Sequence, residues 1–522
     1  MEWLKKNKTL LFSGVSTTII GVVLTAFLMN PKAAYLDSKN TTYLMSAGFI
    51  AMGMAQYPKA IAYLEQALAI DLNIHGEDYP MVAILRRILG NAWLSLDKYS
   101  KAIPYLEQTL ASDLKTYGEY HPKVAISRNI LGGAWHAFGN YAKAIAYYEQ
   151  ALASDLKTYG EDHPEVAVYH NKLGREWKSL GKYSKAIAYY EQALASDLKS
   201  YGEDHPYVAI GRDNLGCAWQ SLGKYSKAIA YHEQALASDL KTYGEDHPTV
   251  AIRRNNLGLA WELLGKYLKA VGYLEQTLAS DLNTFGEDHP TVAVSRNNLG
   301  IAWQSLGKYP KAIAYHEQAL ASDLKTYGED HPSVAVSRNN LGIAWLSLGK
   351  YPKAIAYLEQ ALASGLKTFD EDHPTVATGR NNLGDAWQSL GKYAKAIAYF
   401  EQALASNLNT FGEDHPEVAI SRNNLGSAWK ALGKYSKAIA YHEQALASDL
   451  MTFGEDHPEV AMSRSNLGSA WKALGKYPKA IAYLEQALAS DLKTFGEDHP
   501  RTILRAENLA LAKAEAYKVV QR

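Results

Sequence analysis

Apolar residues recur along most of this chain at the three- and four-residue spacing of amphipathic helices. Within one representative stretch, the pattern predicts two helices and no strand. The first is expected to begin behind Asp288, His289 and Pro290, where an acid can cap the helix and a proline fits its first turn. It ends at Gly307, and the second helix follows over residues 309–326. The unit of the fold is therefore predicted to be an antiparallel helix pair.

This helix pair recurs with a period of 42 residues, and only a tandem array keeps such a register. Ten repeats run over residues 80–499, and a degenerate repeat that lacks the tryptophan covers residues 41–79. Residues 500–522 are predicted to form one capping helix. We expect an all-α solenoid with no domain boundary within residues 38–522. The period is marked by Trp93, Trp135, Trp177, Trp219, Trp261, Trp303, Trp345, Trp387, Trp429 and Trp471.

The composition argues against nucleic-acid binding and against catalysis. The chain carries 54 basic and 54 acidic residues, so it lacks the basic surplus of a nucleic-acid binder. The single cysteine, Cys217, excludes an intrachain disulfide and a cysteine-based metal site. Histidines beside acidic residues, from His121 to His499, each fall at a helix start one repeat apart; they cannot converge on one metal ion and are interpreted as caps. We expect no enzyme, cofactor, metal or small-molecule substrate, because catalysis needs one convergent site.

The segments NNLGIAW, LGKY and KAIAYHEQAL of a single repeat resemble the tetratricopeptide repeat. The 42-residue period and the GEDHP segment are similar to the repeats of kinesin light chains and nephrocystin-3-like proteins. The resemblance implies a right-handed superhelix whose first helices line a concave groove for peptides or partner helices. It implies packing roles for three residues and groove positions for four others, namely Leu299, Gly300 and Trp303, then Asn297, Asn298, Ile301 and Gln304.

Three columns of equivalent positions supply the candidate groove residues. Asparagine amides both donate and accept, so a column of them can hold a peptide backbone without selecting its side chains. This column comprises Asn214, Asn256, Asn298, Asn340, Asn382, Asn424 and Asn466. A variable column beside it would suit an apolar anchor next to a basic residue, through Leu259, Ile301, Ile343 and Asp385. A third column could bind carboxylates of an acidic ligand, through arginines that include Arg254, Arg296 and Arg338.

Structural explanations stand beside these hypotheses. The variable column is equally consistent with neutral drift at a solvent-facing site. The arginines could instead pair with acids of the adjoining helix, such as Glu275 and Glu317. For the whole chain we favour a non-enzymatic scaffold or adaptor that binds a protein or peptide. The alternative is a structural spacer or self-associating array, selected for length and stiffness.

The N-terminus carries a candidate membrane segment. Residues 1–8 contain three lysines, and residues 9–29 form an uncharged run long enough to cross a bilayer core of about 30 Å as a helix. The run exceeds the hydrophobic region of a signal peptide and lacks a clear small-residue cleavage site, so an uncleaved anchor is favoured over a cleaved signal or a peripheral segment. By the positive-inside rule the repeats would lie on the non-cytoplasmic side, behind a short tether at residues 30–40.

Overall fold

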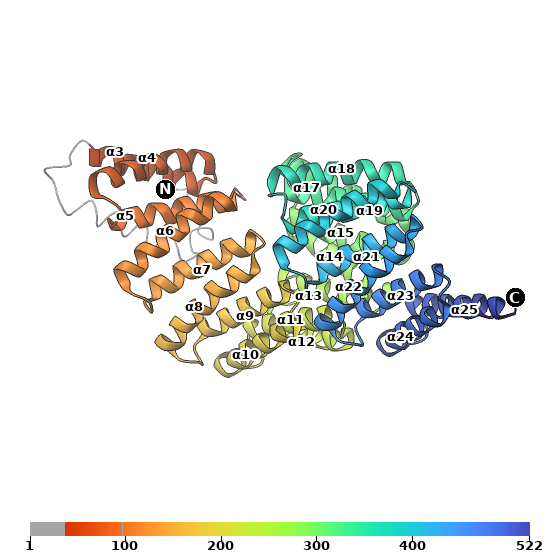
Figure 1. Ribbon diagram of the computed structural model, residues 1–522. Helices are drawn as coiled ribbons and strands as arrows, with labels where there is room; N and C mark the ends of the chain where they lie inside the picture. The colour runs from red at the N-terminus through yellow and green to blue at the C-terminus, as the bar shows by residue number, and fades with distance from the viewer. Residues whose placement is uncertain (1–36, 97, 522) are drawn as a thin grey trace. The chain divides into compact units, whose positions relative to one another are not determined.

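The computed structural model describes residues 37–96 and 98–521, which are arranged in 23 α-helices without a strand (Figure 1). The degenerate repeat forms α3 (Asp37–Gly53) and α4 (Tyr57–His75). Ten repeats follow, each a pair of a first helix, helix A, and a second helix, helix B. The lone helix α25 (Pro500–Val520) comes last. The all-α repeat architecture expected from the sequence is confirmed over these residues.

Every helix A starts at the proline of its repeat and ends two or three residues before the position of Gly307, where the sequence placed its end. The A helices are α5 (Pro80–Leu94), α7 (Pro122–Ala137), α9 (Pro164–Ser179), α11 (Pro206–Ser221), α13 (Pro248–Leu263), α15 (Pro290–Ser305), α17 (Pro332–Ser347), α19 (Pro374–Ser389), α21 (Pro416–Ala431) and α23 (Pro458–Ala473). The B helices are α6 (Tyr99–Tyr117), α8 (Tyr141–Tyr159), α10 (Tyr183–Tyr201), α12 (Tyr225–Tyr243), α14 (Tyr267–Phe285), α16 (Tyr309–Tyr327), α18 (Tyr351–Thr368), α20 (Tyr393–Phe411), α22 (Tyr435–Phe453) and α24 (Tyr477–Phe495).

Histidine, rather than aspartate, caps helix A. The Nδ1 atom of His289 accepts a hydrogen bond from the backbone N–H of Thr291 at 3.2 Å, which satisfies one of the free donors at the helix start. The same bond recurs at the start of α7, α9, α11, α13, α17, α19, α21, α23 and α25. The predicted capping role of the histidines is confirmed. Asp288 was expected as a capping acid, but it lies one residue too early and pairs with Lys325 of helix B.

The described residues form two compact units, one up to residue 96 and one from residue 98, where the sequence predicted one uninterrupted array from residue 38. The division coincides with a change in the turn between helix A and helix B. Nine repeats have glycine there with a positive φ, such as Gly307 at 75°, a conformation that favours glycine. The first full repeat has Asp97 at the same place in the sequence.

Apolar side chains between consecutive helices make a continuous core within the second unit. One cluster joins Leu274 and Leu278 of α14 to Val292 and Leu299 of α15, and Trp303 packs against its edge. At Gly300 the helices approach so closely that an added Cβ would collide with the ring of His316 on α16. The expected packing roles of Leu299, Gly300 and Trp303 are thereby confirmed.

Hydrogen bonds also join A helices to one another across the repeats. Ser305 of α15 donates to Glu262 of α13 at 2.6 Å, and Gln304 of α15 donates to Ser347 of α17 at 3.0 Å. Helices α13, α15 and α17 therefore lie side by side along one face of the array. We call the positions equivalent to Val294, Asn298, Ile301 and Ser305 the A-helix face, because residues spaced in this way share one side of a helix.

Two predictions about the N-terminus fall wholly or partly outside the described residues. The candidate membrane segment at residues 9–29 lies there, as do residues 30–36 of the expected tether. Residues 37–40, which were assigned to the tether, instead belong to the first turn of α3. Among the helices of residues 37–96 and 98–521, none combines the length and the apolar character needed to cross a membrane.

Candidate binding surface

The A-helix face remains partly open to solvent, while the core-facing apolar residues of each A helix are buried. On α15, Leu299 and Ala302 are fully buried, whereas Asn298 and Ile301 are half-buried and Val294 is 57% exposed. The same pattern holds at the other candidate asparagines and at the members of the variable column, all of which are half-buried. The structure therefore brings these two predicted columns together on one surface.

Four of the seven candidate asparagines donate a hydrogen bond to the preceding A helix, and we call the whole column the asparagine ladder. The Nδ2 atom of Asn298 donates to Oδ1 of Asn255 on the preceding A helix at 2.8 Å. Equivalent bonds of 2.8–3.1 Å join Asn382 to Asn339, Asn214 to Asn171 and Asn256 to Asp213. One arm of each amide is thus committed to holding its neighbour in place. An amide has two donors and an acceptor with two lone pairs, so each of these side chains keeps bonding capacity for a ligand.

Asp385 is the only acidic member of the variable column. It is half-buried on α19, one repeat beyond the partly buried Ile343, and no cation or hydrogen-bond donor pairs with it among the described residues. Burial raises the pKa of its carboxyl to about 7. A carboxylate that has lost hydration and has no partner is stabilised when a cation approaches it. A basic group beside the apolar strip therefore fits this position.

Sequence reasoning missed a column of exposed aliphatic side chains on the same face. It lies one helical turn before the asparagine ladder, and its members are 37–57% exposed. The column runs through Ile126, Val168, Ile210, Ile252, Val294, Val336, Ile420 and Met462, with Thr378 as the polar exception. The signal was present in the sequence, since residues at positions i, i+4 and i+7 share a helix face. An apolar stripe that the fold leaves open is typical of an interaction surface.

The candidate arginines do not belong to this open surface. Arg254, Arg296 and Arg338 are at most 9% exposed. The guanidinium of Arg296 donates to the backbone carbonyl of Glu287 at 3.1 Å and forms an ion pair with the carboxylate of the same residue. The hypothesis that they bind an acidic ligand is wrong for these positions, because each arginine is used to hold the loop that precedes its own helix.

The pairing of these arginines also differs from the structural alternative. The expected acids, Glu275 and Glu317, are exposed on helix B, whereas the observed partners are the glutamates of the GEDHP loops, nine residues before each arginine. Asn297 is likewise buried rather than part of the groove, and its Nδ2 atom donates to Ser337 of the next A helix at 2.8 Å. Both residues fix the backbone that carries the A-helix face.

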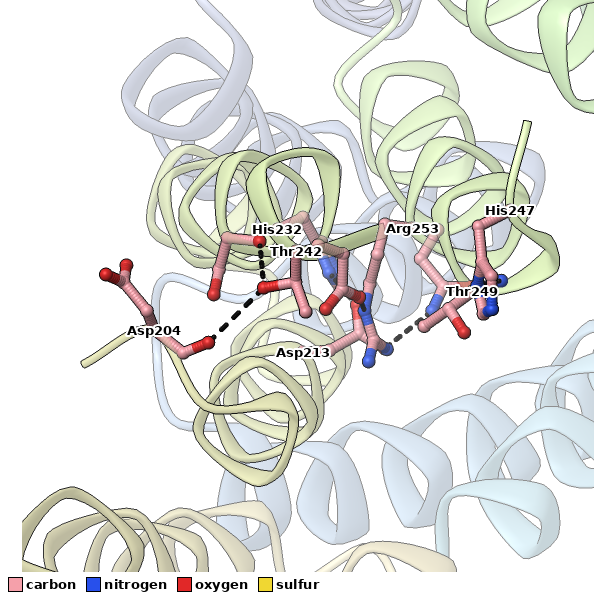
Figure 2. Close-up of polar contacts among 10 residues, drawn as sticks. Asp204, Asp213, His232, Thr242, His247, Thr249 and Arg253 are labelled. Carbon is pink, nitrogen blue, oxygen red and sulfur yellow. Dashed lines mark hydrogen bonds and ion pairs between the residues drawn. The ribbon is translucent and has the colours of Figure 1, made fainter. Parts of the chain in front are cut away.

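Around Asp213, a buried ionic cluster replaces the neutral bond that joins Asn297 to Ser337 (Figure 2). The carboxylate of Asp213 accepts hydrogen bonds from His232 at 2.7 Å, from Arg253 at 2.8 Å and from Asn256 at 2.8 Å. Burial alone would raise the pKa of Asp213, but the His232 hydrogen bond and the Arg253 charge together lower it. Asp213 is therefore a paired structural anion beneath the A-helix face, with no bonding capacity directed at a ligand.

Cys217 faces the same surface but is not a reactive thiol. It is half-buried, and burial raises the pKa of its thiol to about 11, with a further increase from Asp213. Because the thiolate is the nucleophile and the metal ligand, this side chain acts as a small apolar residue. Within the described residues no group of three or more histidine, cysteine or acidic side chains is arranged to hold a metal ion.

The sequence matches the family model described as tetratricopeptide repeat in ten overlapping stretches, from residues 40–115 to residues 430–493. No curated protein matches the chain. Among solved structures it is similar to a Podosopora anserina putative kinesin light chain with nearly identical TPR-like repeats, at 30% identity, 40% coverage of this chain, 98% of that chain and a TM-score of 0.34.

Two further solved structures are similar to the chain at lower identity. BtubC (BKLC) from P. vanneervenii is 22% identical over 44% of this chain and 92% of its own, with a TM-score of 0.37. A Rap protein complexed with competence and sporulation factor is 15% identical over 68% and 99%, with a TM-score of 0.43. The match to the family model covers most of the sequence, and its 42-residue units have the helix bounds described above. The chain therefore belongs to the tetratricopeptide repeat family.

Proposed function

We propose that the A-helix face binds an extended segment or a helix of a partner protein, and that the chain acts as a non-enzymatic interaction scaffold. The observation that carries this proposal is the exposed aliphatic column, which occupies eight of nine successive repeats from Ile126 to Met462 and lies beside the asparagine ladder from Asn214 onward. The aliphatic column offers area for apolar contact, and the ladder offers donors and acceptors to a peptide backbone. Asp385 adds a preference for a basic residue near the C-terminal half.

The test compares substitutions on the A-helix face with matched substitutions on helix B. In the full chain, purified in mild detergent, Asn256→Ala, Asn298→Ala and Asn340→Ala remove three rungs of the ladder. The control removes three exposed amides from the B helices through Gln276→Ala, Gln318→Ala and Gln360→Ala. A peptide selected on the wild-type chain from a random display library is expected to bind the control equally and the ladder variant at least tenfold more weakly, about 1.4 kcal/mol.

Circular dichroism establishes that the two variants keep the same helicity. Equal binding to both variants at preserved helicity would contradict the proposal, because the ligand would then contact another surface. Substituting Asp385→Asn in the same chain should weaken peptides with a basic residue more than neutral ones. This second comparison separates the preference for charge from the backbone clamp.

We also propose that residues 9–29 anchor the array at a membrane, on the strength of their length and lack of charge. Alkaline extraction of membranes that contain the full chain is the test. An anchored protein stays in the pellet, and release of the wild-type chain into the supernatant would refute the anchor. Protease protection of the repeats in sealed vesicles then reports on which side they lie.

A further inference from the structure

Within the second unit, early repeats contact late repeats through two recurring segments. The turn is the segment between helix A and helix B, such as Leu180-Gly181-Lys182, and the loop is the segment that caps the next helix A, such as Asp414-His415-Pro416. The Nε2 atom of His415 donates to the backbone carbonyl of Ser179, beside the turn, at 2.8 Å across 236 residues of sequence. His457 makes the same bond to Ser221 at 3.2 Å, again across 236 residues.

Glycine and proline bring the two segments into close contact. A Cβ atom added to Gly181 would collide with the ring of Pro416, and one added to Gly223 would collide with Pro458. The rings that flank the segments stack as well, with centroids 5.5 Å apart for Tyr183 and Phe453. The turns at Gly139, Gly181, Gly223 and Gly265 therefore meet the loops that begin α19, α21, α23 and α25. We call this series of contacts the seam.

The same two segments occur in other repeats of the second unit without a seam partner among the described residues. An added Cβ would meet nothing within 4 Å at the later turns, which are centred on Gly307, Gly349, Gly391, Gly433 and Gly475. The histidines of the earlier loops are half-exposed, as is His373 at the first seam contact, whereas His415, His457 and His499 of the other three seam contacts are buried. The early loops also expose their aromatic rings, with Tyr159 at 44%, Tyr243 at 38% and Phe285 at 37%.

We propose that a second copy of this chain binds through these free segments, with its early loops seated on the late turns of the first copy. The partner is identified by continuity with the existing seam. Turn and loop sequences are nearly identical from repeat to repeat, so the contact made within one chain can also be made between chains. The early loop of one copy supplies a histidine Nε2 as donor, together with a proline and an aromatic ring. The late turn of the other copy supplies a backbone carbonyl as acceptor, together with a glycine and a tyrosine.

This contact joins two different surfaces, so it is heterologous. Its two halves lie on opposite ends of the repeat series, and a bound copy again presents free late turns. Such an interface continues head to tail unless the rotation closes a ring. The expected product is a linear series of chains whose length grows with protein concentration. The aliphatic column and the asparagine ladder take no part in it, so this inference is independent of the proposed ligand.

The test uses the full chain in mild detergent, with mass measured by light scattering over a concentration series. The loop variant carries Tyr201→Asp, Tyr243→Asp and Phe285→Asp. The turn variant carries Tyr351→Asp, Tyr393→Asp and Tyr435→Asp, which place an acid in the first turn of a B helix, where it is tolerated. The wild-type mass should rise above 57.6 kDa with concentration. Each variant alone should stay at 57.6 kDa, because one half of every contact is missing.

Mixing the variants gives the decisive result. The loop variant keeps intact turns and the turn variant keeps intact loops, so an equimolar mixture should form a species of twice 57.6 kDa and no larger one. A control with Ile210→Asp, Ile252→Asp and Val294→Asp on the A-helix face should associate like the wild type. A wild-type chain that stays monomeric, variants that still associate alone, or a mixture without dimers would overturn the proposal. Loss of association in the control would instead assign it to the A-helix face.

Discussion

Single polar side chains decide how each helix pair is tied to the next. In α17, Ser337 donates to Asp323 of α16 at 2.6 Å and accepts from Asn297 of α15 at 2.8 Å, so one hydroxyl joins three helices. At the equivalent places around α13, an arginine replaces the serine and an aspartate replaces the asparagine. Arg253 then contacts Asp239 and Asp213 at 2.8 Å each. The two substitutions compensate, because the added positive charge offsets the added negative one.

Removing one partner of this buried cluster should be costly, and removing both should not be. Asp213→Asn leaves Arg253 with a single buried carboxylate and is expected to destabilise the chain by about 3–5 kcal/mol. The double change Asp213→Asn with Arg253→Ser recreates the neutral bonding seen around Ser337 and should recover most of that loss. Thermal unfolding of the three proteins is the measurement. A double variant as unstable as the single one would show that the cluster has a role beyond charge compensation.

Sequence reasoning identified which columns are polar but not what each polar group binds. The arginine column was visible from its period, yet its acid partner lies nine residues earlier in a loop, and periodicity alone does not select among several nearby acids. The asparagine column lies partly exposed on the A-helix face, and its binding role stays a prediction. Its repeat-to-repeat bonds depend on the offset between adjacent A helices, which a single repeat does not reveal.

Helices were the easiest feature to predict, because proline and glycine mark their ends. The second helix of the representative repeat was predicted at residues 309–326 and spans Tyr309–Tyr327. Helix α18 departs from the pattern: it ends at Thr368, and the following sequence has Asp370 where other repeats have glycine. Its packing onto α19 also lacks the usual acid and serine, which are replaced by Gly365 and Gly379.

Restoring that pair should strengthen the contact between α18 and α19 cooperatively. Neither glycine is crowded, since an added Cβ would lie 3.8 Å from Val376 at Gly365 and 3.5 Å from Leu362 at Gly379. Each replacement removes a helix-interior glycine, which with aspartate or serine in its place is worth about 0.3–0.5 kcal/mol. Gly365→Asp alone also buries an unpaired carboxyl. Asp197 and Gly211 are the equivalent residues of an earlier repeat, where the acid is present but the serine is not. Burial raises the pKa of Asp197 to about 6, which shows the cost of burying this carboxyl without its serine.

Gly379→Ser supplies the missing donor, so the double variant should be more stable than the sum of the single changes predicts. A double-mutant cycle on the unfolding midpoint gives the coupling, and hydrogen exchange in α18 and α19 shows whether the gain is local. Additive effects would mean that the hydrogen bond seen in other repeats does not form here.

The seam is a property of the whole repeat series and could not be read from one repeat. Each helix pair is rotated slightly from the last, and these small rotations accumulate until α9 meets α21. A change of a few degrees per repeat would move the loop past the turn. The sequence supplied both contact partners but not the rotation that brings them together.

Protonation of the seam histidines should open these contacts in acid. Burial lowers the pKa of His415 and of His457 to about 4. The hydrogen bonds to the carbonyls of Ser179 and Ser221 raise these pKa values, but burial has the larger effect. The cations Lys182 and Lys224, with Arg501, lower these pKa values further. In the open state an exposed histidine has a pKa of about 6.5. The closed seam therefore binds fewer protons between about pH 6.5 and pH 4.

The sign of the pH dependence follows from this difference. The histidine contribution is fully present above about pH 6.5 and falls by about 1.4 kcal/mol per pH unit per histidine as the pH drops toward 4. Glu417 and Glu459 act in the opposite direction, because burial raises their pKa and their protonated forms favour the closed state. We expect the two histidines to outweigh these carboxyls, since protonation also breaks the Nδ1 bonds that cap α21 and α23.

Small-angle scattering of the full chain at about pH 7 and about pH 4.5 is the measurement, at a concentration where the mass is that of one chain. The radius of gyration should increase in acid while the helicity from circular dichroism persists. His415→Asn with His457→Asn keeps a capping acceptor at each helix start but removes two of the four seam histidines, while His373 and His499, whose pKa values burial also lowers, remain. This variant should therefore expand less in acid than the wild type. His205→Asn with His247→Asn, at loops without a seam contact in the same chain, should expand in acid like the wild type. Equal radii for the wild type at the two pH values would contradict acid opening of the seam. Expansion of the first variant as large as that of the wild type would assign the pH response to groups other than His415 and His457.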